Sequence, residues 1–179
     1  MNNLNFHSNR ESSFWIQHLV DGCSGLVIKV KNIIYCDSSP FQKIEVFDTY
    51  NYGRILCLGG SIVMTEKDGY MYHEMMVHPS MLMHENPARV CIIGGGDGGC
   101  LQEVLKYPGF LSVTIIELDE MVTKTINRYF PSLAKGLNDK RVTVSYDDGY
   151  NYLNTHDEKY DIIIVDSYNP DGPIQSFET

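Results

Sequence analysis

A loop of five glycines and one aspartate, residues 94–99, constrains the fold of this chain more than any other segment. The unbroken apolar run 90–93 precedes it, which is typical of a strand buried on both faces. Leu101, Val104 and Leu105 follow at helical spacing. Strand, glycine turn and helix in this order are typical of a doubly wound sheet, which binds small molecules at the carboxyl ends of its strands. Glycine suits such a turn because it allows positive φ and close approach of a ligand.

The same loop matches the dinucleotide pattern G-x-G-x-x-G at Gly94, Gly96 and Gly99. A diphosphate at a helix N-terminus requires positive potential, and the carboxylate of Asp97 opposes it. The loop therefore favours a cationic ligand, and a nicotinamide-dependent oxidoreductase becomes a weaker hypothesis. A tight turn that only connects a strand to a helix is the structural alternative.

Composition narrows the class of protein further. With 179 residues, 43% hydrophobic and 21% charged, the chain fits one globular domain plus a small appendage. Its net charge of −9 argues against binding to nucleic acid and is compatible with cationic substrates. No apolar segment approaches the length of a membrane span. Cys57 and Cys91 lie in apolar runs, and together with the polar residues 1–11 they predict a cytoplasmic protein with reduced thiols.

The amino-terminal third has the pattern of antiparallel strands. Apolar and polar residues alternate between 26 and 65, with turn signals between the runs. The pair Gly59-Gly60 between two apolar runs predicts a hairpin. A short apolar stretch that contains Trp15 comes before them. We therefore expect a small antiparallel β-domain with a polar tail over residues 1–66.

From residue 67 to residue 179 we expect a nucleoside-binding domain. Residues 68–83 favour a helix that Pro79 ends or kinks, and strands then alternate with helices. The expected strands are 90–93, 112–118, 141–146 and 160–165; the expected helices are 101–105, 122–130 (stopped by Pro131) and 150–154. This order predicts a parallel α/β sheet. Since the chain stops soon after the fourth strand, we expect an incomplete sheet that belongs to a fragment or is completed by another chain.

An acid follows each predicted parallel strand. Loops after parallel strands open on the same edge of a sheet, so we expect these carboxylates to converge. The acids are Asp97, Glu117, Asp119, Asp147, Asp148 and Asp166. Glu117 lies where an acid binds a ribose diol, although it could also cap a helix. Asp148, before Gly149, could hold a base amine or cap the next helix. Asp166 could accept a proton, hold an ammonium or form a turn.

No metal site is expected at His73-Glu74 with His78. His73 and His78 are five residues apart, which places them on different faces of a helix. The two-histidine zinc helix requires a spacing of four, and no cysteine lies near this pair.

Several motifs together resemble the spermidine synthases, the polyamine aminopropyltransferases. The similarity runs from about Phe14 to the last residue. It rests on Phe41-Gln42, Gly53-Arg54-Ile55-Leu56, Tyr72-His73-Glu74-Met75-Met76, Gly94 to Gly99 with Asp97, Glu117, Asp148-Gly149, and Asp166-Ser167 with Gly172-Pro173. The resemblance implies a β-domain in front of a Rossmann-like, class I methyltransferase-like sheet, in a homodimer or higher homo-oligomer. It also implies aminopropyl transfer from decarboxylated S-adenosylmethionine, as co-substrate, to putrescine or a related amine, without a metal or prosthetic group.

By matching position, the resemblance assigns roles to individual residues. The donor would be held by Gln42, Gly94, Gly96, Asp97, Gly98, Glu117, Asp148 and Gly149. Asp97 would bind the donor's amine, Glu117 its ribose and Asp148 its adenine. The acceptor amine would be lined by Trp15, Tyr72, His73, Asp97, Asp166 and Asn169.

The aminopropyl transfer is also chemically reasonable on grounds that do not depend on the family resemblance. The sulfonium activates the donor carbon, and the leaving group is neutral and needs no acid. The attacking alkylamine, with a pKa of about 10.4 by analogy with lysine, must lose a proton. Asp166 is the expected proton acceptor, assisted by the hydroxyl of Tyr72.

One residue departs from the family pattern, because Asn169 stands where the family has an acid. An amide brings no negative charge, so we expect weaker acceptor binding or a preference for agmatine, cadaverine or a triamine. Two other functions stay open: a methyltransferase, disfavoured by Ile93 where such enzymes often place an acid, and a non-catalytic or truncated nucleoside-binding subunit.

Overall fold

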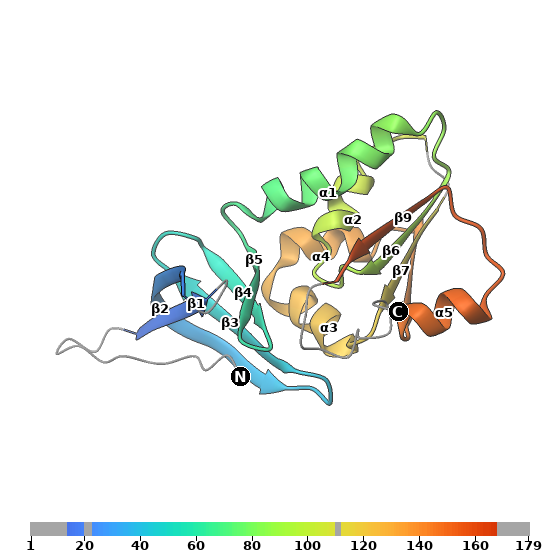
Figure 1. Ribbon diagram of the computed structural model, residues 1–179. Coiled ribbons are helices and arrows are strands. Elements are labelled where there is room, and N and C mark those ends of the chain that lie inside the picture. The colour runs from blue at the N-terminus through green and yellow to red at the C-terminus, as the bar shows by residue number, and fades with distance from the viewer. Residues whose placement is uncertain (1–13, 20–22, 110–111, 168–179) are drawn as a thin grey trace. The chain divides into compact units, whose positions relative to one another are not determined.

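A computed structural model of the chain describes residues 14–19, 23–109 and 112–167 (Figure 1). The chain divides into two compact units, Met1–Gly69 and Tyr70–Thr179, and each is considered separately. Within the described ranges, none of the helices combines the length and apolar character needed to cross a membrane.

The amino-terminal unit is an antiparallel sheet of consecutive strands, in the order β1-β2-β3-β4-β5. The strands are β1 (Phe14–Leu19), β2 (Gly25–Ser38), β3 (Lys43–Thr49), β4 (Arg54–Leu58) and β5 (Ser61–Thr65). Ile16, Phe47 and Ile55 belong to the buried core of this sheet. The predicted hairpin is confirmed: Gly59 and Gly60 connect β4 to β5 with φ of 57° and 87°.

The second unit contains the predicted parallel sheet, built from β6 (Arg89–Gly94), β7 (Ser112–Glu117), β8 (Val142–Tyr146) and β9 (Ile162–Asp166). The strand order is β8-β7-β6-β9. The chain moves outward from β6 to β8 and then returns to the other side of β6. Adjacent strands β6 and β9 therefore flank a topological switch point, where sheets of this kind bind ligands.

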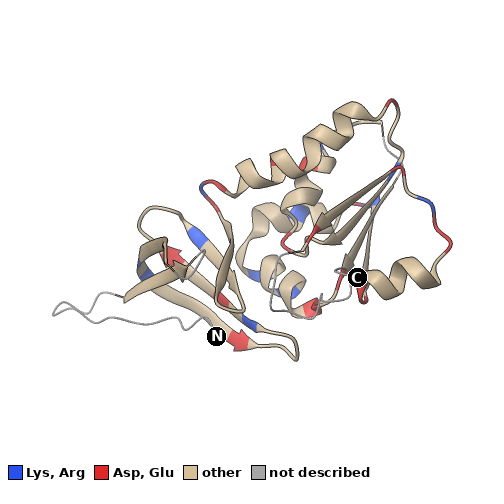
Figure 2. Cartoon of the chain, viewed as in Figure 1, with Lys and Arg blue, Asp and Glu red and all other residues tan. Residues whose placement is uncertain are grey.

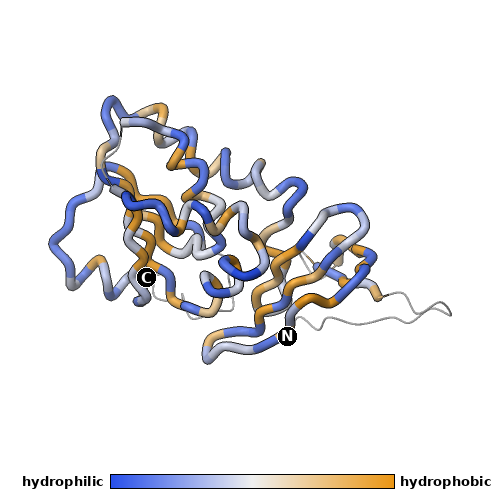
Figure 3. Tube along the Cα trace, turned by 180° about the vertical axis from the view of Figure 1, so that it is seen from behind, coloured by the Kyte–Doolittle hydropathy of each residue, from blue (hydrophilic) through white to orange (hydrophobic). Residues whose placement is uncertain are grey.

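Helices cover both faces of the parallel sheet. Side chains of α1 (Gly69–Met83) and α2 (Gly99–Val104) pack on the face that includes Ile92 and Ile115. On the opposite face, Tyr152 of α5 (Gly149–Thr155) packs on Cys91 and Ile93. Figure 3 shows hydrophobic residues along the strands of this sheet, and the central strands β6 and β7 are buried on both faces, as predicted for residues 90–93.

Pro131 stops a helix as expected but also starts another, and Pro79 does not have the first of its two expected effects, ending its helix or kinking it. Pro131 ends α3 (Glu120–Tyr129) but also begins α4 (Pro131–Leu137), a helix that the sequence analysis missed. Proline fits the first turn because the backbone N–H that it lacks has no intrahelical partner there. Pro79 does not end α1, which continues through it to Met83.

Candidate functional site

The candidate site lies at the switch point, where the glycine loop after β6 meets the end of β9. Gly94 is aligned with Asp166 in the parallel pairing of the two strands. The backbone N–H of Gly95 donates to the carbonyl oxygen of Asp166 at 3.0 Å. Figure 2 marks acids at these strand ends in red. The backbone thus brings the loop and Asp166 together before any side chain is considered.

The carboxyl group of Asp166 is buried and only partly satisfied. The hydroxyl of Tyr72, on α1, donates to its Oδ1 at 3.0 Å. Its Oδ2 is buried and has no hydrogen-bond partner among the described residues. Burial, followed by the nearby charge of Asp97, raises the pKa of Asp166. A carboxylate with a raised pKa is a suitable proton acceptor.

His73 and Asp97 form the second part of the site. His73 is 3% exposed, and its Nε2 lies 3.4 Å from Oδ2 of Asp97, without the alignment of a hydrogen bond. Burial alone would lower the pKa of His73, but the interaction with Asp97 outweighs it and raises that pKa. The backbone N–H of Gly99 holds the other oxygen of Asp97 at 2.9 Å. A Cβ atom at Gly99 would overlap the imidazole of His73, so this position requires glycine.

These residues form a compact group of negative character. Ligand atoms of His73, Asp97 and Asp166 all lie within 4.8 Å of one another. A histidine and two carboxylates can bind a divalent cation, and they suit an alkylammonium equally well. The sequence predicted no metal at His73-Glu74 with His78; in the structure, His78 lies with Glu103 in a different cluster from His73. The two histidines therefore do not share a site.

Glu117 connects the glycine loop to the end of β7. Its carboxylate is buried and accepts the backbone N–H groups of Gly96 and Asp119, each at 2.9 Å. Burial raises the pKa of Glu117, although these two bonds act in the opposite direction. The open helix-cap alternative applies to Asp119 instead, which caps α3 by accepting from Met121 N. Each carboxylate oxygen can accept a further hydrogen bond, so a ribose diol remains compatible with this geometry.

The acids after β8 lie at the same edge of the sheet. The N–H of Asp147 donates to the carbonyl of Glu117 at 3.2 Å. Asp148 caps α5 by accepting from Asn151 N with its Oδ1 at 2.9 Å, and Gly149 begins that helix. Asp148 therefore caps the helix, which was one of its two predicted roles. The other role, binding a base amine, remains a prediction.

Some predicted site residues lie elsewhere. Gln42 precedes β3 and Trp15 lies on β1, with the ammonium of Lys29 5.9 Å from the centre of a Trp15 ring. Both belong to the amino-terminal unit, so their roles remain predictions. Asn169, together with the motif residues Gly172 and Pro173, lies outside the described residues.

Sequence reasoning did not single out Cys100, which is fully buried in the first turn of α2. Burial, and then the neighbouring Asp166, raise the pKa of its thiol. Its place directly after the glycine loop was the only available signal.

Two family models match this chain. The spermine/spermidine synthase domain matches residues 69–179, and the spermidine synthase tetramerisation domain matches residues 14–66. The two matches correspond to the parallel α/β unit and to the antiparallel β-unit of the fold. This chain belongs to the spermidine synthase family.

Similarity to individual curated proteins supports the same family assignment. The chain is 43% identical over 146 residues to the polyamine aminopropyltransferase of Thermoanaerobacter sp. (strain X514), covering 82% of this chain and 53% of the relative. It is 40% identical over 164 residues to that of Xanthomonas axonopodis pv. citri (strain 306), covering 91% and 58%. The chain therefore spans about half the length of the curated relatives it matches.

Solved structures support the same fold. A spermidine synthase in complex with the transition state analogue AdoDATO is 34% identical, with a TM-score of 0.86, over 96% of this chain and 58% of the other. The spermidine synthase from Thermotoga maritima is 34% identical with a TM-score of 0.84, over 95% and 57%. The predicted combination of an antiparallel β-domain with a Rossmann-like parallel sheet is confirmed.

Proposed function

We propose that this protein transfers an aminopropyl group from decarboxylated S-adenosylmethionine to an alkylamine such as putrescine, and releases methylthioadenosine. The observation that carries the proposal is the group of His73, Asp97 and Asp166 at the switch point. Both substrates of this reaction are cations, and buried carboxylates favour cations. The names of the relatives, polyamine aminopropyltransferases and spermidine synthases, support the same reaction.

The donor would bind along the carboxyl edge of the parallel sheet. Glu117 would accept hydrogen bonds from the ribose hydroxyls, as acids at the end of the second strand do in nucleotide-binding sheets. Asp97 would hold the amine of the aminopropyl chain, and Asp148 with Gly149 the adenine. Gly94, Gly96 and Gly98 would let the donor approach the backbone, and Gln42 would add a contact from the amino-terminal unit.

The transfer is a single displacement. The acceptor nitrogen forms a bond to the propyl carbon next to sulfur, the carbon–sulfur bond breaks, and its electron pair neutralises the sulfonium. The attacking nitrogen loses one proton, and Asp166 is the proposed acceptor for it because burial has raised its pKa. Tyr72 would orient that carboxylate through its hydrogen bond. Holding nitrogen, carbon and sulfur in line lowers the barrier further.

The acceptor is the least defined substrate. Tyr72, His73, Asp97 and Asp166 would line it, and Trp15 and Asn169 would complete it. Since Asn169 carries no charge where the family has an acid, agmatine, cadaverine and a triamine are candidates beside putrescine. The match to a tetramerisation domain supports a homo-oligomer, which light scattering after size-exclusion chromatography would test.

The purified chain should be incubated with decarboxylated S-adenosylmethionine and each of these amines, with mass spectrometry of the products. An aminopropyl adduct together with methylthioadenosine is the expected result. A methylated amine formed from S-adenosylmethionine would identify a methyltransferase instead. Calorimetric binding of methylthioadenosine without turnover would identify a nucleoside-binding subunit, and absence of nucleoside binding would overturn the proposal.

A further inference from the structure

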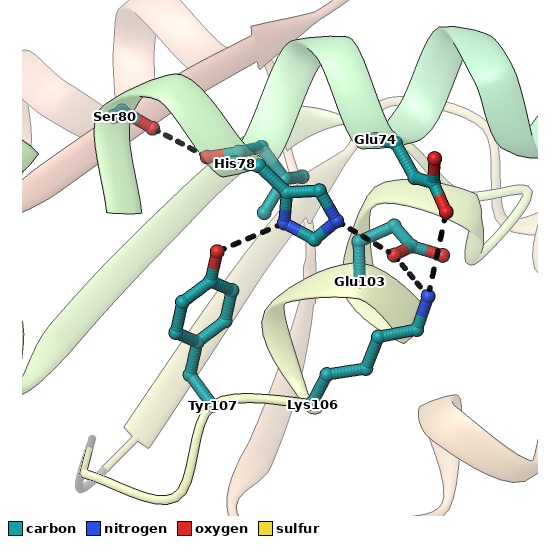
Figure 4. Close-up of polar contacts among 7 residues, drawn as sticks. Glu74, His78, Ser80, Glu103, Lys106 and Tyr107 are labelled. Atoms are coloured by element: carbon teal, nitrogen blue, oxygen red, sulfur yellow. Dashed lines mark hydrogen bonds and ion pairs between the residues drawn. The ribbon is translucent and has the colours of Figure 1, made fainter. Parts of the chain in front are cut away.

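A second polar cluster lies on α1 and α2, separate from the candidate site (Figure 4). Its members are Glu74 and His78 of α1, Glu103 of α2, and Lys106 and Tyr107 just after α2. Glu103 is 4% exposed, whereas the side chains of Glu74 and Lys106 are 41% and 53% exposed. The cluster therefore has a buried carboxylate at its base and an opening to solvent.

Three of these side chains have the spacing of a metal site. Glu74 and His78 are four residues apart, so they share one face of α1. Ligand atoms of Glu74, His78 and Glu103 all lie within 4.8 Å of one another. His78 Nε2 is 3.3 Å from Glu103 Oε2. Tetrahedral zinc with bonds of about 2.0–2.1 Å separates its ligand atoms by roughly 3.3 Å, so these two atoms already stand at the required distance.

The imidazole of His78 is oriented so that its Nε2 atom can bind a metal ion. Its Nδ1 is hydrogen-bonded to the hydroxyl of Tyr107 at 2.9 Å. Histidine ligands are usually fixed by such a bond from the second ring nitrogen, which leaves the first nitrogen for the metal. Figure 4 shows Nε2 on the other side of the ring, directed toward Glu103.

A cation already occupies the position between the carboxylates. The ammonium of Lys106 forms a close ion pair with Glu103 and lies 3.9 Å from Glu74. The side chain of Lys106 is half exposed, so its head group can reach water, and an incoming divalent ion would keep the buried carboxylate of Glu103 paired with a positive charge. Its ammonium marks where a positive ion is stabilised.

We propose that Glu74, His78 and Glu103 form a binding site for a divalent transition-metal ion such as Zn²⁺, which displaces the ammonium of Lys106. The ion would join α1 to α2. Because α1 also carries Tyr72 and His73, and α2 follows the glycine loop, the bound metal would hold together the two helices that border the candidate site. No metal was expected from the sequence at His73-Glu74 with His78, because the two histidines lie on different faces of the helix; the proposed site uses His78 without His73 and takes its third ligand, Glu103, from α2.

The test uses the full chain, stripped with a chelator and titrated with ZnCl₂ by calorimetry, with Co²⁺ absorption as a second readout. Wild-type protein should bind one ion with a tetrahedral cobalt spectrum. His78→Gln should lower the affinity by at least about tenfold, and Tyr107→Phe by about tenfold. Lys106→Met should raise it by about two- to fivefold, because a competing cation is removed. His73→Gln is the matched control and should bind like wild type.

Three results would overturn the proposal: no binding to the wild-type chain, unchanged affinity in His78→Gln, or loss of binding in His73→Gln. The last would place the ion among His73, Asp97 and Asp166 instead. Circular dichroism establishes that each variant is folded. If His78→Gln does not fold, Lys106→Met keeps all three ligands and decides the matter, since an affinity at or below that of wild type contradicts displacement of the lysine.

Discussion

Helix α1 carries two histidines, and each meets two carboxylates, but the two clusters differ in how their charges are balanced. Around His78, the ammonium of Lys106 neutralises Glu103, and Tyr107 satisfies the imidazole. Around His73, none of the ion pairs within the described residues brings a lysine or arginine to Asp97 or Asp166. His73 Nε2 and Asp166 Oδ2 have no hydrogen-bond partner among those residues.

The difference separates a cluster whose charges are balanced by protein groups from one whose charges are not. Burying a carboxylate is costly unless a positive group accompanies it, and the cluster around Glu103 includes that group. The cluster around Asp166 has only His73 as a positive partner, and burial, followed by the charge of Asp97, raises the pKa of Asp166. Such an arrangement persists where a cationic ligand completes it, which is why perturbed acids indicate active sites.

The largest effect that can test this comparison is loss of turnover in Asp166→Asn. Asparagine keeps the shape but cannot accept the proton of the attacking amine, so kcat should fall by about 10²- to 10⁴-fold. Product formation from the donor and the preferred amine measures it. The matched control is Asp157→Asn, an exposed acid in the loop after α5, which should leave kcat unchanged. Equal activity in Asp166→Asn and wild type would refute the proposed role.

The next effect concerns how closely α1 approaches the glycine loop. In Gly99→Ala, the new methyl group would overlap the imidazole of His73, which must move. We expect a loss of about 1–3 kcal/mol in stability, as for other overpacked sites, together with reduced turnover. Urea denaturation measures the first. Gly109→Ala is the control, because no described residue lies within 4 Å of its added Cβ, and it should be nearly neutral. A stable, active Gly99→Ala would show that this contact does not restrict the site.

The third prediction is that removing a carboxylate changes the stability of the protein in opposite directions in the two clusters. At neutral pH, Glu103→Gln should destabilise the protein by about 1–2 kcal/mol, because it weakens bonds to Lys106 and His78. Asp166→Asn should stabilise it, because it removes an acid that burial and Asp97 disfavour. Thermal melts of both variants between pH 3 and pH 8 would measure the two effects.

The pH dependence of the Asp166 effect follows from the raised pKa. The native protein binds the Asp166 proton more tightly than the unfolded chain, whose pKa is about 3.9. The stability that this tighter proton binding contributes is therefore fully present below the unfolded pKa. It is lost as the pH rises through the native pKa of Asp166. Asp166→Asn should match wild type below about pH 4 and exceed it at neutral pH. A variant less stable than wild type at pH 7 would contradict the assignment.

The sequence predicted one cluster and missed the other for a physical reason. Acids after parallel strands must meet at one edge, so Asp97, Glu117 and Asp166 could be brought together without coordinates. Glu103 gave no such signal, since a glutamate in a helix is usually solvated. Its burial depends on how α2 packs against its neighbours in the fold. Glu74 and His78 had the right spacing, but spacing does not reveal a third ligand on another helix.

The missed helix has a similar explanation. Proline disrupts a helix when it lies in the helix interior. It is favoured in the first turn of a helix, because its fixed φ suits that position. Sequence alone does not distinguish a chain that leaves α3 at Pro131 from one that turns and continues. In this protein the second possibility holds, because Ala134 and Gly136 of α4 find buried positions.

The smallest effects on stability come from paired hydroxyl deletions, one in each cluster. Tyr107→Phe removes the bond to His78 and should lower the free energy of unfolding by about 0.5–1.5 kcal/mol without changing turnover. Tyr72→Phe removes the bond to Asp166 and should do the reverse: little change in stability, and turnover lower by up to about 10²-fold, because Asp166 loses its orientation. Denaturation measures the stability of both variants, and product formation measures their turnover. If the two variants affected stability and turnover alike, the contrast between a satisfied and an unsatisfied cluster would fail.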